Sequence, residues 1–97
     1  MAYSEILRAI NIVKKPEYLT FRGILQLKYE DYQEAISDFR QALTIDPNYS
    51  LAQYYKARAL FLEKNGDTES LLKEVNLAIE VDKKNPRAWL LKAQTII

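Results

Sequence analysis

Apolar residues recur along this chain at steps of three and four, the spacing that places side chains on one face of an α-helix. The clearest stretch is residues 31–47, in which Ala35, Phe39 and Ala42 share one face and polar residues occupy the other. This pattern predicts an amphipathic helix whose small and large apolar side chains pack into a core. We therefore expect this face to hold the fold together and not to contact a ligand.

Boundary signals accompany the helical pattern. Asp31 occupies a favourable N-cap position, and Glu34 follows three residues later, as in a capping box. Pro47 ends the helix, because the residue before a proline is pushed out of the α-helical region. Along the whole chain, the same signals predict a single all-α domain over residues 1–97. Its helices are expected at approximately 2–13, 17–29, 32–45, 51–64, 68–81 and 87–97.

The helix expected at 17–29 is apolar on two opposite sides. Leu19 and Gly23 lie on one side, and Phe21 and Ile24 point roughly the other way. Such a helix is either sandwiched between others or keeps one side for a partner. Glycine in a helix interior costs about 1 kcal/mol relative to alanine, so Gly23 predicts the close approach of another helix.

Composition and charge exclude several function classes. The chain has 97 residues, a formal net charge of +1, and neither Cys nor His. This excludes disulfides, cysteine nucleophiles and histidine bases, and we expect no catalysis, no metal and no cofactor. No apolar run approaches the roughly 18 residues of a membrane-spanning helix, and the N-terminus lacks the charge order of a signal peptide. A cytoplasmic protein that binds neither membrane nor nucleic acid is the default expectation.

The helical pattern also repeats along the chain. Two sets of small residues recur at similar intervals and mark the period: Ala9, Ala42 and Ala78, and Gly23, Ala59 and Ala93. On this spacing, Ala59 takes the place in its helix that Gly23 takes in the helix at 17–29.

The period and its residue types resemble the tetratricopeptide repeat, a hairpin of two helices over about 34 residues. Residues 16–51 match best, and the signature types fall at Gly23, Asp31, Tyr32, Ala35, Phe39, Ala42, Asp46 and Pro47. Residues 52–85 form a degenerate second unit, and half-units flank the two. The resemblance implies a right-handed α-solenoid of antiparallel helical hairpins with about six helices.

The order of these helices is out of register with the family's hairpin. It implies an excised part of a longer array, a designed or permuted chain, or a small protein whose ends pair with another copy.

Members of this family hold peptides or helices on the concave surface formed by the first helix of each hairpin. Carried over to this chain, the candidate groove comprises Thr20, Phe21, Ile24, Leu27, Lys28, Lys56, Ala57, Leu60, Lys64 and Leu91. The same side is expected to hold Glu17, Gln53, Glu63, Arg87, Leu90, Gln94 and Ile97. The centre of this groove is apolar and lysines lie nearby, which favours an amphipathic helix or an extended peptide. The alternative is that Phe21 and Leu60 simply pack between neighbouring helices.

Chaperone-binding members of the family grip a C-terminal carboxylate with a constellation of Lys, Asn and Arg. Here Thr20, Ile24, Ala57 and Leu91 stand at places that this clamp needs, although Arg87 is basic. A chaperone-tail adaptor is therefore disfavoured.

Three hypotheses about function follow. The leading one is a protein–protein interaction scaffold without catalysis, which binds a protein or peptide partner. The second is an assembly module that self-associates through uncapped terminal helices into a dimer, a domain swap or a superhelical array. The third is an RNA-binding helical repeat, which the near-neutral charge and the apolar groove disfavour.

Overall fold

The computed structural model describes residues 15–64 and 66–96. Within these ranges the chain forms five α-helices and no strand: α2 (Pro16–Lys28), α3 (Tyr32–Ile45), α4 (Ser50–Glu63), α5 (Thr68–Val81) and α6 (Pro86–Ile96). The all-α fold predicted from the sequence is confirmed, and the predicted ranges of these five helices differ from the observed bounds by at most one residue. The helix predicted at 2–13 lies outside the described residues. Among the residues searched, no helix has the length and apolarity needed to cross a membrane.

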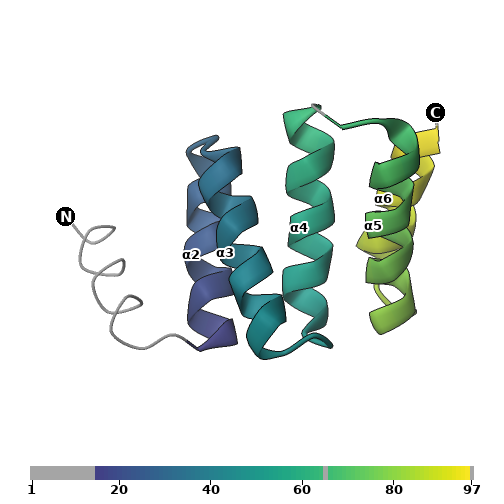
Figure 1. Cartoon of the computed structure of the whole chain (residues 1–97). Helices are drawn as coiled ribbons and strands as arrows, with labels where there is room; N and C mark the ends of the chain where they lie inside the picture. The colour runs from purple at the N-terminus through teal and green to yellow at the C-terminus, as the bar shows by residue number, and fades with distance from the viewer. Residues whose placement is uncertain (1–14, 65, 97) are drawn as a thin grey trace.

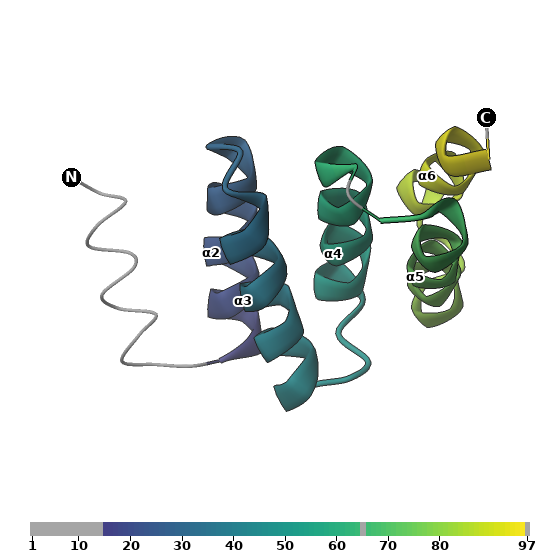
Figure 2. The same cartoon turned by 45° about the horizontal axis from the view of Figure 1, so that its top comes forward.

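Consecutive helices run antiparallel and pack side by side in chain order (Figure 1). Helix α4 also contacts both α2 and α6, whereas α3 and α5 make no contact with each other. The helices therefore form two layers, with α2, α4 and α6 in a continuous layer and α3 and α5 in a split one (Figure 2). Because the helices approach more closely in the first layer, the array is concave on the side of α2, α4 and α6.

Two prolines and one aspartate mark the starts of α2, α6 and α5. Pro16 and Pro86 occupy the first turns of α2 and α6, where the missing N–H group is harmless. Asp67 caps α5, since its Oδ1 atom accepts a hydrogen bond of 2.7 Å from the backbone N–H of Ser70.

The start of α3 differs from the predicted capping box. Asp31 holds the N-cap position, but its side chain makes no capping hydrogen bond within the described residues. Backbone groups close this turn instead: the N–H of Asp31 donates to the carbonyl of Gln26 at 2.9 Å, and Glu30 takes a left-handed conformation with φ 62°. The turn backbone thus fixes the α2–α3 hairpin without the Asp31 carboxylate.

The apolar face of α3 forms the centre of the first hairpin, as predicted. Ala35, Phe39 and Ala42 are fully buried. A Cβ atom added to Gly23 would lie 2.5 Å from Cε1 of Phe39, so α2 and α3 cross at a distance that only glycine permits. The close helix approach predicted from Gly23 is confirmed.

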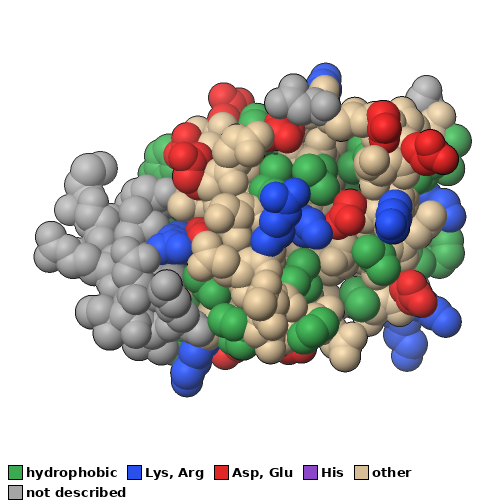
Figure 3. Space-filling model, viewed as in Figure 1, with side chains coloured by type: hydrophobic (Ala, Val, Ile, Leu, Met, Phe, Trp, Pro, Cys, Tyr) green, Lys and Arg blue, Asp and Glu red, His purple; other side chains and the backbone are tan. Residues whose placement is uncertain are grey.

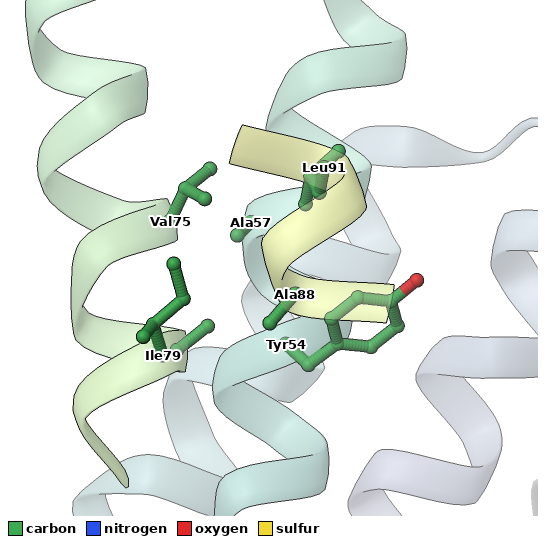
Figure 4. Close-up of a cluster of buried hydrophobic side chains, with 7 residues drawn as sticks. Tyr54, Ala57, Val75, Ile79, Ala88 and Leu91 are labelled. Atoms are coloured by element: carbon green, nitrogen blue, oxygen red, sulfur yellow. The ribbon is translucent and has the colours of Figure 1, made fainter. Parts of the chain in front are cut away.

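The second hairpin corrects the assignment of Ala59 as the counterpart of Gly23. Ala57 is the residue buried against its own hairpin partner α5, beside Val75 and Ile79 (Figure 4). Ala59 is buried instead against Phe39 and its neighbours on the preceding helix α3. The counterpart of Gly23 is therefore Ala57, two positions before the predicted Ala59.

The physical reason is a longer second hairpin. In the first hairpin, α2 begins at Pro16 and α3 at Tyr32. In the second, α4 begins at Ser50 and α5 at Thr68, so two more residues separate the helix starts. The repeat spacing inferred from the sequence placed these two extra residues before the small residue of α4, although they lie after it. Because an α-helix turns about 100° per residue, a two-residue error rotates the assigned face by about 200°.

Candidate functional site

A groove of about 590 Å³ opens on the concave side of the array, between α2, α4 and α6. Its lining residues are Ile24, Leu27, Lys28, Tyr54, Tyr55, Arg58, Leu62, Arg87, Leu90, Leu91 and Gln94. They include apolar side chains from every one of the three helices, two tyrosines and three cations. We call this surface the concave groove.

Helical periodicity places these side chains together. Tyr54, Arg58 and Leu62 follow one another at steps of four on α4, so they form one continuous stripe along the middle of the groove. Helices α2 and α6 supply the two walls, through Ile24 and Leu27 on one and Leu90 and Leu91 on the other. The groove therefore depends on the register of α4 more than on any loop.

Aromatic packing anchors the groove in the core. The rings of Tyr54 and Tyr55 meet edge to face with centroids 5.1 Å apart. Tyr55 also stacks at 6.2 Å on Phe39, which lies against Gly23. Tyr54 is buried and belongs to the cluster that joins α4, α5 and α6 (Figure 4). Side chains held by such contacts keep their conformation, so the shape of the groove is fixed by the core beneath it.

The charge of the concave groove is one-sided. Lys28, Arg58 and Arg87 line it, and no Asp or Glu from the described part of the chain does. None of these three cations forms a salt bridge within the described residues. Cations beside apolar walls raise the local potential for an approaching anion, since the walls exclude water.

The structure divides the ten predicted groove residues into three groups. Ile24, Leu27, Lys28 and Leu91 line the concave groove. Of the additional residues, Arg87, Leu90 and Gln94 line it too, Glu17, Gln53 and Glu63 do not, and Ile97 lies outside the described residues. Thr20 and Ala57 are buried, and Phe21 is exposed but lies outside the lining. Lys56, Leu60 and Lys64 line a different hollow, described below.

Four lining residues were missed by the sequence reasoning: Tyr54, Tyr55, Arg58 and Leu62. They are the counterparts, in the register of Gly23 and Ala57, of four residues of α2: Thr20, Phe21, Ile24 and Lys28. A constant step of one repeat length would have found all four. The prediction used the step from Gly23 to Ala59, which is two residues longer. It therefore named Lys56, Ala57, Leu60 and Lys64, which lie two positions further along the chain and face the other way.

Two consecutive hairpins and an added helix in this arrangement define a helical-hairpin repeat domain. The family model for the tetratricopeptide repeat matches residues 16–49, the hairpin of α2 and α3. Residues 16–49 are thus a tetratricopeptide repeat, and the chain has the fold of tetratricopeptide repeat domains.

Solved structures support the same fold over nearly the whole chain. The first TPR of Spaghetti (RPAP3), bound to an HSP90 peptide, has a TM-score of 0.88 and 18% identity, and the match covers 98% of this chain and 75% of that one. The second TPR domain of human RPAP3, in complex with an HSP70 peptide, has a TM-score of 0.83 and 22% identity, with coverage of 99% and 79%. The TPR2B domain of yeast Sti1, in a complex with pHsp70, has a TM-score of 0.85 and 22% identity, with coverage of 98% and 80%. A comparison with curated proteins gives no match.

Proposed function

We propose that this chain is a non-catalytic interaction module whose concave groove binds a partner segment carrying both acidic and apolar side chains. One observation supports this most directly: among the described residues, three cations and no carboxylate line a groove whose walls are apolar. Arg58, at the centre of the α4 stripe, offers a planar donor suited to a carboxylate. Leu90, which is largely exposed, offers surface for leucine-like side chains.

The structurally similar domains bound to HSP90 and HSP70 peptides support a peptide as the ligand. This groove differs from the carboxylate clamp that the family resemblance implies for such tails. At four positions that the clamp needs, this chain has no Lys, Asn or Arg. Thr20 is buried, Ile24 and Leu91 are apolar, and Tyr55 takes the place that was first assigned to Ala57. We therefore propose that acidic side chains within the segment, and not its terminal carboxylate, provide the charge contacts.

Fluorescence anisotropy with labelled peptides tests this proposal. The probe is a capped peptide of alternating leucine and glutamate, and the comparison peptide is SRMEEVD with either a free or an amidated C-terminus. Arg58→Gln should raise the Kd of the capped probe about tenfold, the effect of losing roughly 1.4 kcal/mol. Lys84→Gln is the matched control, because it removes the same charge from an exposed turn outside the groove.

The outcomes are distinct. Loss of affinity in Arg58→Gln but not in Lys84→Gln supports the groove, and similar affinities of the two SRMEEVD forms support side-chain recognition. Equal weakening by the two variants would mean that only net charge matters. A large loss on amidation would show that a terminal carboxylate is the ligand.

Self-association is the second candidate, and the surface of α6 favours it. Trp89, Leu90 and Ile96 are 50%, 60% and 62% exposed, an unusual density of large apolar side chains on one short helix. Light scattering over a wide concentration range tests this candidate. A mass that rises with concentration and falls in Trp89→Glu supports it, and a constant monomer mass rejects it.

A further inference from the structure

A second hollow, of about 370 Å³, lies on the face opposite the concave groove. It is lined by Arg40 of α3, by Lys56, Leu60 and Lys64 of α4 and its C-cap, and by Gly66, Ser70, Leu71, Lys73 and Glu74 of the following turn and α5. Helices α3 and α5 do not contact each other, so this hollow occupies the split between them, above α4. We call it the convex hollow.

Helix α4 separates the two surfaces. Leu60 lies two residues before Leu62, and Lys56 lies two residues before Arg58, so each pair is rotated by about 200° around the helix axis. Leu62 and Arg58 line the concave groove, and Leu60 and Lys56 line the convex hollow. The two surfaces therefore lie on opposite sides of α4 and share no lining residue.

Positive charge gathers at the convex hollow. Figure 3 shows Lys and Arg side chains beside an acidic one near the centre of this face. Of the residues that the structure describes, four cations and one carboxylate line the hollow, and that carboxylate, Glu74, already has partners. Its Oε1 atom lies 2.8 Å from Nζ of Lys56 and 3.3 Å from Nε2 of Gln53. Within the described residues, Arg40, Lys64 and Lys73 form no salt bridge.

The pKa of Glu74 reflects the positive charge around it. Partial burial alone would raise the pKa of Glu74, but the salt bridge from Lys56, the hydrogen bond from Gln53 and the charge of Arg40 lower it overall. The carboxylate of Glu74 therefore stays ionised and neutralises one cation. The remaining three cations leave the hollow with excess positive charge.

The floor of the convex hollow is apolar. Leu60 packs against the buried cluster of α3, and Leu71 packs against the cluster of α4, α5 and α6. Both leucines are partly exposed and line the hollow, and Ser70 lines it as well. A cationic rim around a small apolar floor fits a carboxylate-bearing segment with one apolar side chain. It does not fit a nucleic-acid backbone, which needs an extended basic surface.

We propose that the convex hollow is a second docking site, which binds an acidic segment of a protein partner by placing one leucine-like side chain on Leu60 and Leu71. Arg40, Lys64 and Lys73 contact the flanking carboxylates of that segment. This site goes beyond the proposed function, because it uses α3, α5 and the opposite face of α4. The chain can then hold two acidic segments at once, one on each face.

Nuclear magnetic resonance resolves the two sites on the intact chain. The probe is the peptide Ac-EELEE-NH2, titrated into 15N-labelled protein, with amide shifts followed at Ser70–Glu74 for the hollow and at Arg58 and Gln94 for the groove. The test variant is Lys64→Gln with Lys73→Gln, both exposed lysines, and the groove variant is Arg58→Gln. Circular dichroism verifies that each variant remains helical.

We expect the probe to shift the Ser70–Glu74 amides, and the double lysine variant to weaken this response about tenfold while groove shifts persist. Arg58→Gln should give the reverse pattern. Hollow shifts without any groove shifts would support this site and contradict the proposed function. Shifts confined to the groove, hollow shifts unchanged in the double variant, or tighter binding of a single-stranded RNA oligonucleotide at the hollow would overturn the proposal.

Discussion

A Cβ atom at Gly23 would lie 2.5 Å from Cε1 of Phe39, closer than real Cβ atoms approach a neighbour. The Phe39 ring cannot retreat easily, because it is fully buried and stacks against Tyr55 at 6.2 Å. Tyr55 in turn lines the concave groove. The contact between Gly23 and Phe39 thus sets both the spacing of α2 from α3 and the position of one groove side chain.

We predict that Gly23→Ala destabilises the fold. Overpacking costs about 1–3 kcal/mol, and the clash with a ring that cannot retreat argues for the upper end of this range. Alanine returns about 1 kcal/mol of helix propensity, so the net loss in the free energy of unfolding should be about 2 kcal/mol. Urea denaturation followed by circular dichroism measures it. Gly66→Ala is the control, since an added Cβ there meets nothing within 4 Å. Equal stability of Gly23→Ala and the unsubstituted chain would show that the helices can move apart freely.

A second prediction concerns the ion pair between Arg22 and Asp38, which ties α2 to α3. Nε and Nη2 of Arg22 donate to the two carboxylate oxygens of Asp38, each at 2.7 Å, and both side chains are largely buried. Removing one charge of a buried pair costs about 3–5 kcal/mol, because the other is left in a poorly solvated place. Asp38→Asn should therefore lower the urea midpoint strongly.

The double variant Arg22→Met with Asp38→Leu serves as its control, because replacing both charges with apolar groups is often nearly neutral. It should be more stable than Asp38→Asn alone. If Asp38→Asn has no measurable effect, the pair behaves as an exposed salt bridge and contributes little to stability.

The cap of α5 predicts an acid dependence of stability. The backbone N–H of Ser70, which donates to Asp67, lowers the pKa of that carboxylate below its ordinary value. A lowered pKa in the folded state stabilises the fold above the pKa of the unfolded chain, and this contribution disappears as the pH falls through the folded value. The melting temperature should therefore decline below about pH 4, the ordinary range of an aspartate.

Asp67→Asn isolates this contribution. Asparagine keeps a capping oxygen but does not titrate, so the melting temperature at neutral pH should stay close to that of the unsubstituted chain and its acid decline should become shallower. Asp31→Asn is the matched control, because the Asp31 side chain makes no capping hydrogen bond within the described residues. Identical acid curves for all three proteins would contradict the assignment.

Much of the fold follows from local signals in the sequence. The spacing of Ala35, Phe39 and Ala42 is a property of one helix, so the apolar pattern alone was sufficient to predict their burial. The presence of Gly23 likewise pointed to a close helix approach, because an unfavourable residue in a helix interior needs a packing reason.

The candidate site was harder to predict, because it depends on register between helices. Ala57 and Ala59 are chemically identical and lie two residues apart, yet they pack against α5 and α3 respectively. Nothing local distinguishes them; only the length of the second hairpin does. Because of this two-residue error, Lys56, Leu60 and Lys64 were predicted in the groove although they face away from it, and Arg58 was not predicted.

This register supports a last prediction, on two leucines of the same helix. Leu60 and Leu62 are both partly buried, but Leu62 lines the concave groove and Leu60 lines the convex hollow. Leu62→Gln should weaken binding of the leucine–glutamate probe at the groove about tenfold, since losing an apolar contact of this size costs about 1–2 kcal/mol. Leu60→Gln should leave the groove affinity unchanged while lowering the urea midpoint modestly, because Leu60 also packs against the core of α3. Groove shifts in nuclear magnetic resonance titrations of the two variants measure the difference. If Leu60→Gln, and not Leu62→Gln, abolishes those shifts, the binding surface lies on the opposite face of α4.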